Sequence, residues 1–394
     1  MQKPSIGVLG GCGHVGLPLA LTFASKGCQV TIVDIDEKAV EAVGRGEVGF
    51  MEEGAAELLR AHLGKTLSVT RDSSRLGACD VVVCVVGTPV DEHLNPKVNN
   101  LIRVVTELKP WLRSGQLFVL RSTVYPGATE YLARWFDEHV PGVDVAFCPE
   151  RVAQGYSIRE TQELPQIVSG ATPRAYERAA ALFGMLSKTI VPLAPTEAEL
   201  AKLMCNAWRY VTFAAANQFY SLCARNGIDY YRVHSAVVKD YPRMRGLPGA
   251  GFAAGPCLFK DTMQLAAFFE NEFSLGQSAM LVNEGFPRIL MQQLRPLGLR
   301  DKRVGLLGMA FKGDNDDTRE SLAFKMKKLL ELECKEVLCT DEFVRNEAFV
   351  PLEAVLEKAD LLVISAPHSR YKALTTSKPV LDAWNLLGRG GLLA

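Results

Sequence analysis

The chain has 394 residues, 48% of them hydrophobic, with 44 basic and 44 acidic side chains and a formal net charge of zero. This length suits two or three domains, and the charge balance argues against a nucleic-acid-binding surface. An apolar run of about 18 residues, which a transmembrane helix needs, is absent from the sequence. The ten cysteines form no CxxC or His/Cys ligand pattern. We therefore expect a reduced, cytoplasmic globular protein without a metal site and without a nucleic-acid or membrane partner.

The N-terminal stretch has the pattern of a dinucleotide-binding unit. Residues 5–10 are an apolar run typical of a buried parallel strand, residues 11–16 read Gly-Cys-Gly-His-Val-Gly, and a strand at 29–33 ends at Asp34. The glycines allow a tight turn close to a pyrophosphate, and the following helix offers free N–H groups to it. An acid after the second strand binds the adenosine ribose and repels a 2′-phosphate, so the pattern predicts NAD rather than NADP. The predicted cofactor-binding residues here are Gly11, Gly13, His14, Val15, Gly16 and Asp34.

Three further buried strands are predicted, at 79–86, 116–120 and 143–147, and each runs into a polar turn. These turns contain Gly87, Thr88 and Pro89, then Ser122 and Thr123, then Glu150 and Arg151. In an open parallel sheet, ligands bind beyond the carboxyl ends of the strands. We therefore expect the three turns to face one crevice. Short strands at 167–169 and 189–191 complete a first domain of residues 1–195.

A long helix is predicted next. Thr196 and Glu199 have the spacing of a capping box, and no proline or glycine follows until Gly227, so the helix should have about 30 residues. Lys202 and Asn206 are four residues apart and share one face of it. They predict either a polar spot beside the core or a solvated surface pair. A long helix with aromatic residues is also a possible dimer interface.

Residues 249–261 read Gly-Ala-Gly-Phe-Ala-Ala-Gly-Pro-Cys-Leu-Phe-Lys-Asp and present Cys257 beside Lys260 and Asp261. The glycines leave the backbone free to approach a ligand. A thiol in such a loop is a candidate nucleophile, although most free cysteines are small buried hydrophobic residues. Arg243 and Arg245 precede the loop and suit a phosphate.

From residue 301 the N-terminal pattern restarts, with later strands at 336–339 and 359–364 but without GxGxxG. Lys312 and Arg319 are the candidate ligand-contacting charges of this part. The predicted fold class is α/β, with two Rossmann-like doubly wound domains joined by a long central helix. The predicted boundaries are 1–195 for the NAD-binding domain, 196–297 for a helical dimerisation domain with the cysteine loop, and 298–394 for the second Rossmann-like domain.

Taken in order, these motifs resemble the UDP-glucose/GDP-mannose dehydrogenase family over nearly the whole chain. The motifs are Gly11 to Gly16 with Asp34, Gly87-Thr88-Pro89, Ser122-Thr123 with Pro126-Gly127, Pro149-Glu150, Lys202 with Asn206, Gly255-Pro256-Cys257 with Lys260-Asp261, and Phe311-Lys312 with residues 316–321. Residues 149–155 and 164–170, and the Gly-Pro-Cys-Leu around Cys257, look more like the enzymes acting on UDP-N-acetylhexosamines than those acting on UDP-glucose.

The resemblance implies NAD-dependent, four-electron oxidation of the C6 hydroxyl of a UDP-sugar, with UDP-N-acetylmannosamine as the first candidate substrate. The implied intermediates are a thiohemiacetal and a thioester of the cysteine. The product would be a uronate for polysaccharide biosynthesis. The implied catalytic residues are Cys257, Lys202, Asn206, Glu150, Asp261 and Thr123. Further cofactor contacts would come from the turns at Gly87, Thr88, Pro89, Ser122 and Thr123 and from Arg319. Substrate contacts would come from Glu150, Arg151, Lys202, Asn206, Arg243, Arg245, Phe252, Lys260, Phe311 and Lys312. The family also implies a homodimer or higher homo-oligomer.

One position departs from the family. Many relatives carry Asp-x-Arg near the C-terminus, with the arginine toward the sugar nucleotide, whereas this chain has Asp382-Ala-Trp384. The alternatives that remain open are UDP-N-acetylglucosamine or UDP-glucose as substrate, a two-electron hydroxyacid-type dehydrogenase, and a non-catalytic nucleotide-sugar binder.

Overall fold

The computed structural model describes residues 3–87, 90–91 and 99–393. The chain forms two compact units, Met1–Met204 and Cys205–Ala394. Helix α8 (Pro195–Arg225) runs without a break from the first unit into the second, which confirms the predicted long helix. The three-part division at residues 195 and 297 stays a prediction. In the described part of the chain, no helix is long and apolar enough to cross a membrane.

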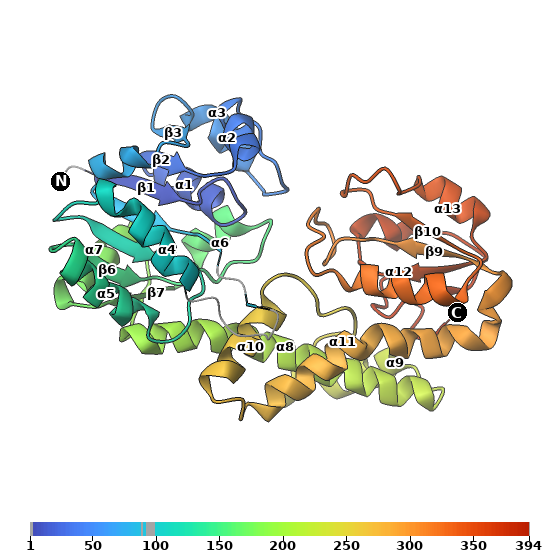
Figure 1. Cartoon of the computed structure of the whole chain (residues 1–394). Helices are drawn as coiled ribbons and strands as arrows, with labels where there is room; N and C mark the ends of the chain where they lie inside the picture. Colours follow the sequence, from blue (N-terminus) through green and yellow to red (C-terminus); the bar gives the residue numbers. More distant parts are fainter. Residues whose placement is uncertain (1–2, 88–89, 92–98, 394) are drawn as a thin grey trace. The chain divides into compact units, whose positions relative to one another are not determined.

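The first unit is built on one sheet with the strand order β3-β2-β1-β4-β5-β6-β7-β8 (Figure 1). Its strands are β1 (Ser5–Leu9), β2 (Gln29–Val33), β3 (Leu67–Thr70), β4 (Val81–Cys84), β5 (Leu117–Leu120), β6 (Asp144–Phe147), β7 (Gln166–Gly170) and β8 (Ile190–Pro192). All neighbours run parallel except β6 and β7. The first six strands follow the order of a dinucleotide-binding fold, whose ligand crevice opens where the order reverses beside β1.

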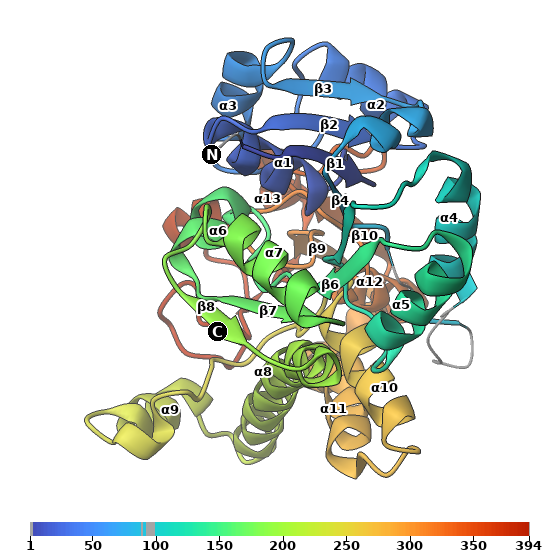
Figure 2. The same ribbon diagram turned by 90° about the vertical axis from the view of Figure 1, so that its left-hand side faces the viewer.

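Helices cover both faces of this sheet, which explains why its strands are continuously apolar. They are α1 (Gly16–Ser25), α2 (Glu37–Gly44), α3 (Ala55–His62), α4 (Asn99–Leu108), α5 (Ala128–His139), α6 (Ser157–Glu163) and α7 (Pro173–Phe183). Val81 and Val83 belong to the core on one face, with residues of α1 and α7. Val82 and Cys84 belong to the core on the other face, with residues of α4 and α5 (Figure 2).

The second unit contains a smaller parallel sheet with the order β10-β9-β11-β12. Its strands are β9 (Arg303–Leu307), β10 (Glu336–Thr340), β11 (Leu361–Ile364) and β12 (Val380–Leu381), and its helices are α9 (Tyr230–Val238), α10 (Leu258–Phe268), α11 (Ser274–Leu294), α12 (Leu322–Glu333) and α13 (Leu352–Lys358). The order repeats that of β2-β1-β4-β5, so the predicted fold class, with a second Rossmann-like domain, is confirmed.

The start of α8 differs from the prediction. The helix begins at Pro195, and the N–H of Ala194 donates to the Glu197 carboxylate at 2.8 Å. The predicted capping box of Thr196 and Glu199 is therefore wrong, because the residue before the helix is Ala194, two positions before Thr196, and the Glu197 side chain reaches back to its N–H.

Glu199 instead caps a different helix. Its buried carboxylate accepts the N–H of Gly127 at 2.6 Å and both the N–H and the hydroxyl of Thr129, at 2.8 and 2.5 Å, where α5 begins. Burial raises the pKa of Glu199, while these bonds act to lower it. The carboxylate thus ties the first turns of α8 to α5 within the first unit.

This arrangement makes Glu199→Ala much more destabilising than Glu197→Ala. The first change leaves three donors at the start of α5 without their acceptor and should lower the free energy of unfolding by about 2–4 kcal/mol. The second removes an exposed helix cap and should cost about 1 kcal/mol. Urea unfolding followed by circular dichroism measures both, and equal losses would contradict the role given to Glu199.

Candidate active site

The glycine-rich turn after β1 is closely packed at two of its glycines and open at the third. A Cβ on Gly16 would lie 2.5 Å from the Cα of Gly11, and one on Gly11 would lie 2.8 Å from the Val8 carbonyl oxygen. A Cβ on Gly13 would meet no atom within 4 Å. Gly11 and Gly16 therefore allow α1 to pack against the turn, whereas Gly13 leaves its backbone accessible to a ligand.

Asp34 is held at the end of β2 by backbone donors. Its carboxylate accepts the N–H of Cys12 at 2.9 Å and that of Asp36 at 3.1 Å, and the side chain is only half-buried. Burial, Asp34 and Asp36 raise the pKa of Cys12 to about 12, so this cysteine remains a neutral thiol. These bonds fix the Asp34 carboxylate at the end of β2, and its role as the acceptor for a ribose stays a prediction.

The remaining predicted cofactor residues of the first unit lie at strand ends. Val15 is the N-cap of α1, and Gly87 is exposed after β4. Ser122 and Thr123 are half-buried after β5. Thr88 and Pro89 lie outside the described residues.

Residues 50–52 contact two of the loops that carry predicted site residues. The ring of His14, in the glycine-rich turn, stacks on Phe50 with the ring centroids 4.2 Å apart. The carboxylate of Glu52 accepts the N–H groups of Gly155 and Ile158, both at 3.0 Å, at the end of the loop after β6. This short segment therefore supports both the cofactor turn and the loop that contains Glu150.

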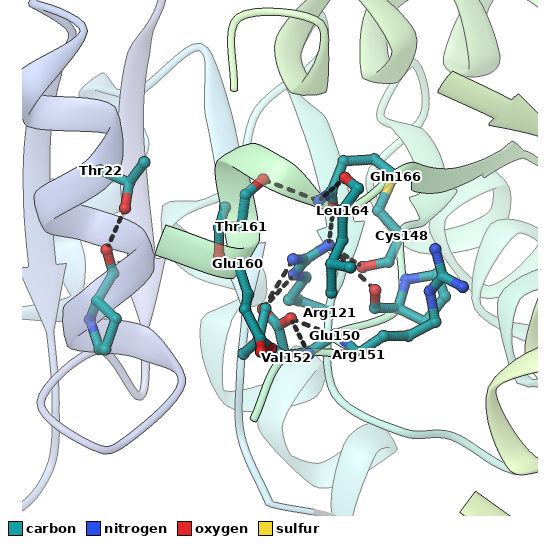
Figure 3. Close-up of polar contacts among 12 residues, drawn as sticks. Thr22, Arg121, Cys148, Glu150, Arg151, Val152, Glu160, Thr161, Leu164 and Gln166 are labelled. Atoms are coloured by element: carbon teal, nitrogen blue, oxygen red, sulfur yellow. Dashed lines mark hydrogen bonds and ion pairs between the residues drawn. The ribbon is translucent and has the colours of Figure 1, made fainter. Parts of the chain in front are cut away.

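Glu150 is paired with a cation that sequence reasoning left without a role. Arg121 is fully buried, and its guanidinium donates to the Glu150 carboxylate at 2.7 and 3.1 Å (Figure 3). The other oxygen of Glu150 accepts the N–H groups of Arg151 and Val152 at 2.8 and 3.0 Å. The carboxylate is therefore held in place at both oxygens.

Arg121 also fixes the chain that leads to Glu150. It donates to the carbonyl oxygens of Cys148 and Pro149 at 3.0 and 3.1 Å and to the Gln166 side chain at 3.1 Å. Its guanidinium lies 5.0 Å from the centre of the Phe183 ring. The sequence signal that could have revealed Arg121 is a single basic residue directly after an apolar strand. A buried guanidinium at such a position requires an anion and several hydrogen-bond acceptors.

Lys202 and Asn206 are both buried, which rules out a solvated surface pair. Within the second unit, the Asn206 amide donates to the Asp261 carboxylate at 2.6 Å. The Lys260 ammonium lies 2.6 Å from the other oxygen of Asp261, which is itself completely buried. Lys260 thus points to Asp261, and Asp261 orients the Asn206 amide.

Cys257 is exposed at the N-cap of α10, and its carbonyl oxygen accepts the N–H of Asp261 at 2.9 Å. The N-terminal end of a helix stabilises negative charge and so favours a thiolate. Arg319 forms a bidentate ion pair with Asp317, at 2.6 to 3.0 Å. Its pKa is raised chiefly by Asp317 and to a smaller extent by the Cys257 sulfur.

The glycines of the cysteine loop make room for aromatic rings of the protein itself. A Cβ on Gly251 would lie 2.3 Å from the ring of Trp384, and one on Gly255 would lie 2.6 Å from the ring of Phe311. The expectation that these glycines serve ligand approach is therefore incomplete. Trp384, which stands where relatives carry an arginine, packs against the loop that precedes Cys257.

The other predicted substrate residues are distributed differently. Phe252 is buried and packs on Phe286 at a centroid distance of 6.2 Å, so its side chain belongs to the core. Arg243 and Arg245 are exposed, and Lys312 is half-buried next to Phe311. A cavity of about 300 Å³ borders the cysteine loop and is lined by residues of α10, α11 and α12 as well as residues 253–255.

The doubly wound sheet, the glycine turn and Asp34 together define an NAD-binding oxidoreductase. Sequence profiles of the UDP-glucose/GDP-mannose dehydrogenase family match the chain in order: the NAD binding domain over residues 5–187, the central domain over 196–285 and the UDP binding domain over 305–389. The chain belongs to this family and is an NAD-dependent UDP-sugar dehydrogenase.

Relatives extend over nearly the whole chain. A UDP-N-acetyl-D-mannosamine dehydrogenase from Pyrococcus horikoshii is 32% identical, over 92% of this chain and 90% of the relative. A solved structure of UDP-D-ManNAc dehydrogenase from the same organism has a TM-score of 0.91 at 29% identity, covering 97% and 96% of the two chains. The solved structure of a UDP-glucose dehydrogenase from Pyrobaculum islandicum has a TM-score of 0.89 at 28% identity, and the match covers 97% of this chain and 94% of that one.

Substitution of Gly16 tests the cofactor turn. Gly16→Ala would force α1 away from Gly11, so we expect the dissociation constant for NADH to rise at least about tenfold, a loss of about 1.4 kcal/mol. Gly44→Ala is the matched control, because its Cβ would meet only Val69 at an ordinary 3.7 Å. Titration of NADH fluorescence measures both, and unchanged binding by Gly16→Ala would contradict this view of the turn.

Proposed function

We propose that this enzyme oxidises the C6 hydroxyl of a UDP-N-acetylhexosamine to a carboxylate, with UDP-N-acetylmannosamine as the first candidate. The overall change consumes one water and two NAD⁺ and gives two NADH. The observation that carries the proposal is an exposed cysteine at a helix N-terminus, in a chain that also binds NAD. A two-electron alcohol dehydrogenase has no need of such a thiol.

Cys257 would act on the aldehyde formed in the first oxidation. An aldehyde offers no readily transferable hydride, whereas its tetrahedral adduct with a thiolate does. Attack of the sulfur gives a thiohemiacetal, loss of the second hydride to NAD⁺ gives a thioester, and water releases the uronate and the thiolate. The α10 N-terminus and Arg319 would stabilise the thiolate before attack and after release.

Lys202 and Asn206 would stabilise the oxygen at C6. An alkoxide or oxyanion develops on this oxygen in each step, and an ammonium and an amide N–H₂ group are suitable donors. In this scheme Asp261 positions Asn206 through the 2.6 Å bond rather than meeting the sugar itself.

Thr123 and Glu150 would position the water that hydrolyses the thioester. The Glu150 carboxylate is fixed by Arg121 at one oxygen and by two backbone N–H groups at the other, so it is a rigid hydrogen-bond acceptor. We therefore assign Glu150 to orienting the water. Arg151, Arg243, Arg245 and Lys312 would bind the phosphates or sugar oxygens.

The choice of sugar follows the named relatives, because the sequence relative and the solved structure from Pyrococcus horikoshii are both named for the N-acetylmannosamine nucleotide. UDP-N-acetylglucosamine and UDP-glucose are the rival substrates, the latter because a UDP-glucose dehydrogenase is structurally close. Trp384 in place of the family arginine favours a sugar-nucleotide contact that differs from that of many relatives.

The test is a panel of UDP-sugars assayed for NADH release, with the product counted. We expect two NADH per UDP-N-acetylmannosamine, and less activity with the glucose and N-acetylglucosamine nucleotides. Cys257→Ser should form no more than one NADH per sugar and no uronate. A serine hydroxyl is a much weaker nucleophile than a thiolate, and an ester is hydrolysed less readily than a thioester.

Cys205→Ser is the matched control, since Cys205 is also an exposed cysteine but lies on α8. It should keep the full yield. One NADH per sugar from the wild-type enzyme would support the two-electron alternative, and uronate from Cys257→Ser would exclude this cysteine as the nucleophile.

We also infer that a second copy of the chain binds the exposed apolar face of α8. Trp208, Phe219 and Leu222 lie on one side of the helix, because 11 residues make about three turns, and they are 67%, 46% and 64% exposed. An apolar helical stripe of this kind is typical of an interface, and an isologous dimer buries it against itself.

Trp208→Glu should therefore convert a dimer into a monomer in light scattering coupled to size-exclusion chromatography. The control is Leu332→Glu on α12, where an exposed apolar residue, 82% accessible, lies outside this stripe. A monomeric wild-type protein, or a dimer that persists in Trp208→Glu, would contradict the proposed interface.

A further inference from the structure

The ends of the strands in the second sheet repeat a detail of the first. Gly10 follows β1 with φ +76°, and its N–H donates to the Val33 carbonyl oxygen at 2.8 Å. Gly308 follows β9 with φ +87°, and its N–H donates to the Thr340 carbonyl oxygen at 2.9 Å. Asp341, the next residue after Thr340, thus occupies the place that Asp34 has in the NAD-binding sheet.

The two acids accept a backbone N–H from equivalent positions, and the side chain of Asp341 is closed off from solvent. The N–H of Ala310 donates to Asp341 at 3.0 Å, as that of Cys12 donates to Asp34 at 2.9 Å. Both residues are partly buried as a whole, and the side chain of Asp341 is completely buried. The Asp341 carboxylate is therefore not available to a ribose and has a different hydrogen-bond partner.

That partner is His368. The Nε2 of His368 lies 3.0 Å from the Asp341 carboxylate, and its Nδ1 accepts the N–H of Asp314 at 2.9 Å. Because Nδ1 accepts a backbone N–H, the ring proton lies on Nε2. His368 is completely buried, and its ring packs against Phe343 and Tyr371 at centroid distances of 4.9 and 5.5 Å.

Asp314 belongs to the segment 308–321, which contacts the cysteine loop. Asp314 itself has a strained φ of +49°, and its carboxylate accepts the N–H and the hydroxyl of Ser369. Two positions earlier is Lys312, and before it Phe311, whose ring lies against Gly255, two residues from Cys257. The contacts therefore form a chain from Asp341 through His368 to the turn at Asp314.

We propose that His368 is a positioning residue, which holds the turn at Asp314 so that Lys312 and Phe311 are presented to the UDP-sugar and to the loop of Cys257. The proposal rests on the function proposed above in one respect, the binding of a uridine diphosphate. Asp341, at the position that Asp34 has in the first sheet, supports this turn from inside the domain through His368.

Two substitutions of His368 separate its two hydrogen bonds. The amide of His368→Asn reaches the place of Nδ1 and can still accept from Asp314, but it cannot reach Asp341. The amide of His368→Gln reaches the place of Nε2 and can still donate to Asp341, but it offers no acceptor to Asp314. If the bond to Asp314 matters, only the glutamine variant should bind substrate poorly.

The experiment measures the dissociation constant for UDP by titration calorimetry on the full-length protein. We expect an increase of about tenfold for His368→Gln and within about twofold for His368→Asn, with the constant for NADH unchanged in both. Ser369→Ala, at an exposed position, loosens the same turn without touching the core and should raise the constant about threefold. It keeps the test valid if a histidine variant folds poorly.

A second readout does not depend on UDP. The rate at which iodoacetamide alkylates Cys257, followed by peptide mass spectrometry, should rise about threefold in His368→Gln, because Phe311 no longer holds Gly255. Equal effects of the asparagine and glutamine variants, or a fall in melting temperature with unchanged UDP binding and unchanged alkylation, would overturn the proposal. Failure of the wild-type protein to bind UDP would instead overturn the proposed function, and the alkylation rates would still decide the role of His368.

Discussion

Buried negative charge held by fixed donors is the constraint on which both units of this protein depend. A carboxylate taken out of water is unfavourable unless hydrogen bonds or a cation replace its hydration. Glu150 receives a buried guanidinium and two backbone N–H groups. Asp261 receives an amide and an ammonium. In each case the donors fix the direction of the acid, so the residues that surround it, and not the acid alone, determine the shape of the site.

The backbone of the cysteine loop is fixed in another way, by side chains from distant parts of the sequence. Its glycines leave space that Trp384 and Phe311 fill, and Asn217 accepts the N–H of Gly251 at 2.9 Å while it donates to Asn283. The backbone before Cys257 is therefore held from several directions by residues distant in sequence. A high glycine content therefore does not make this loop mobile, because neighbouring rings fill the space that side chains would occupy.

Local patterns predict much of this molecule. The bounds of β2 and the long α8 follow from apolar runs and from the positions of glycine and proline, because these depend on residues close in sequence. The NAD turn is recognisable since each glycine has a separate steric task. The strand β3 reads Leu-Ser-Val-Thr and lacks the continuous apolar run of the central strands, and β12 has only two residues, so neither gives a clear signal.

The parts that escape prediction are contacts between distant residues. No pattern near Arg121 predicts its ion pair with Glu150, 29 residues later. The role of His368 likewise depends on its hydrogen bonds to Asp314 and Asp341. Glu199 matches a local cap motif, yet it satisfies a helix 70 residues away. Such tertiary partners override local preferences, because a buried donor without an acceptor is more unfavourable than a helix end exposed to water.

The short segment of residues 50–52 has a consequence for how this enzyme can change. Phe50 supports the turn that approaches the cofactor, and Glu52 supports the loop that follows Glu150. A loop of different sequence at residues 149–158 must still bring these two backbone N–H groups to the Glu52 carboxylate. Exchanges between relatives should therefore carry both segments together, since Glu52 and the donors at Gly155 and Ile158 form one hydrogen-bonded unit.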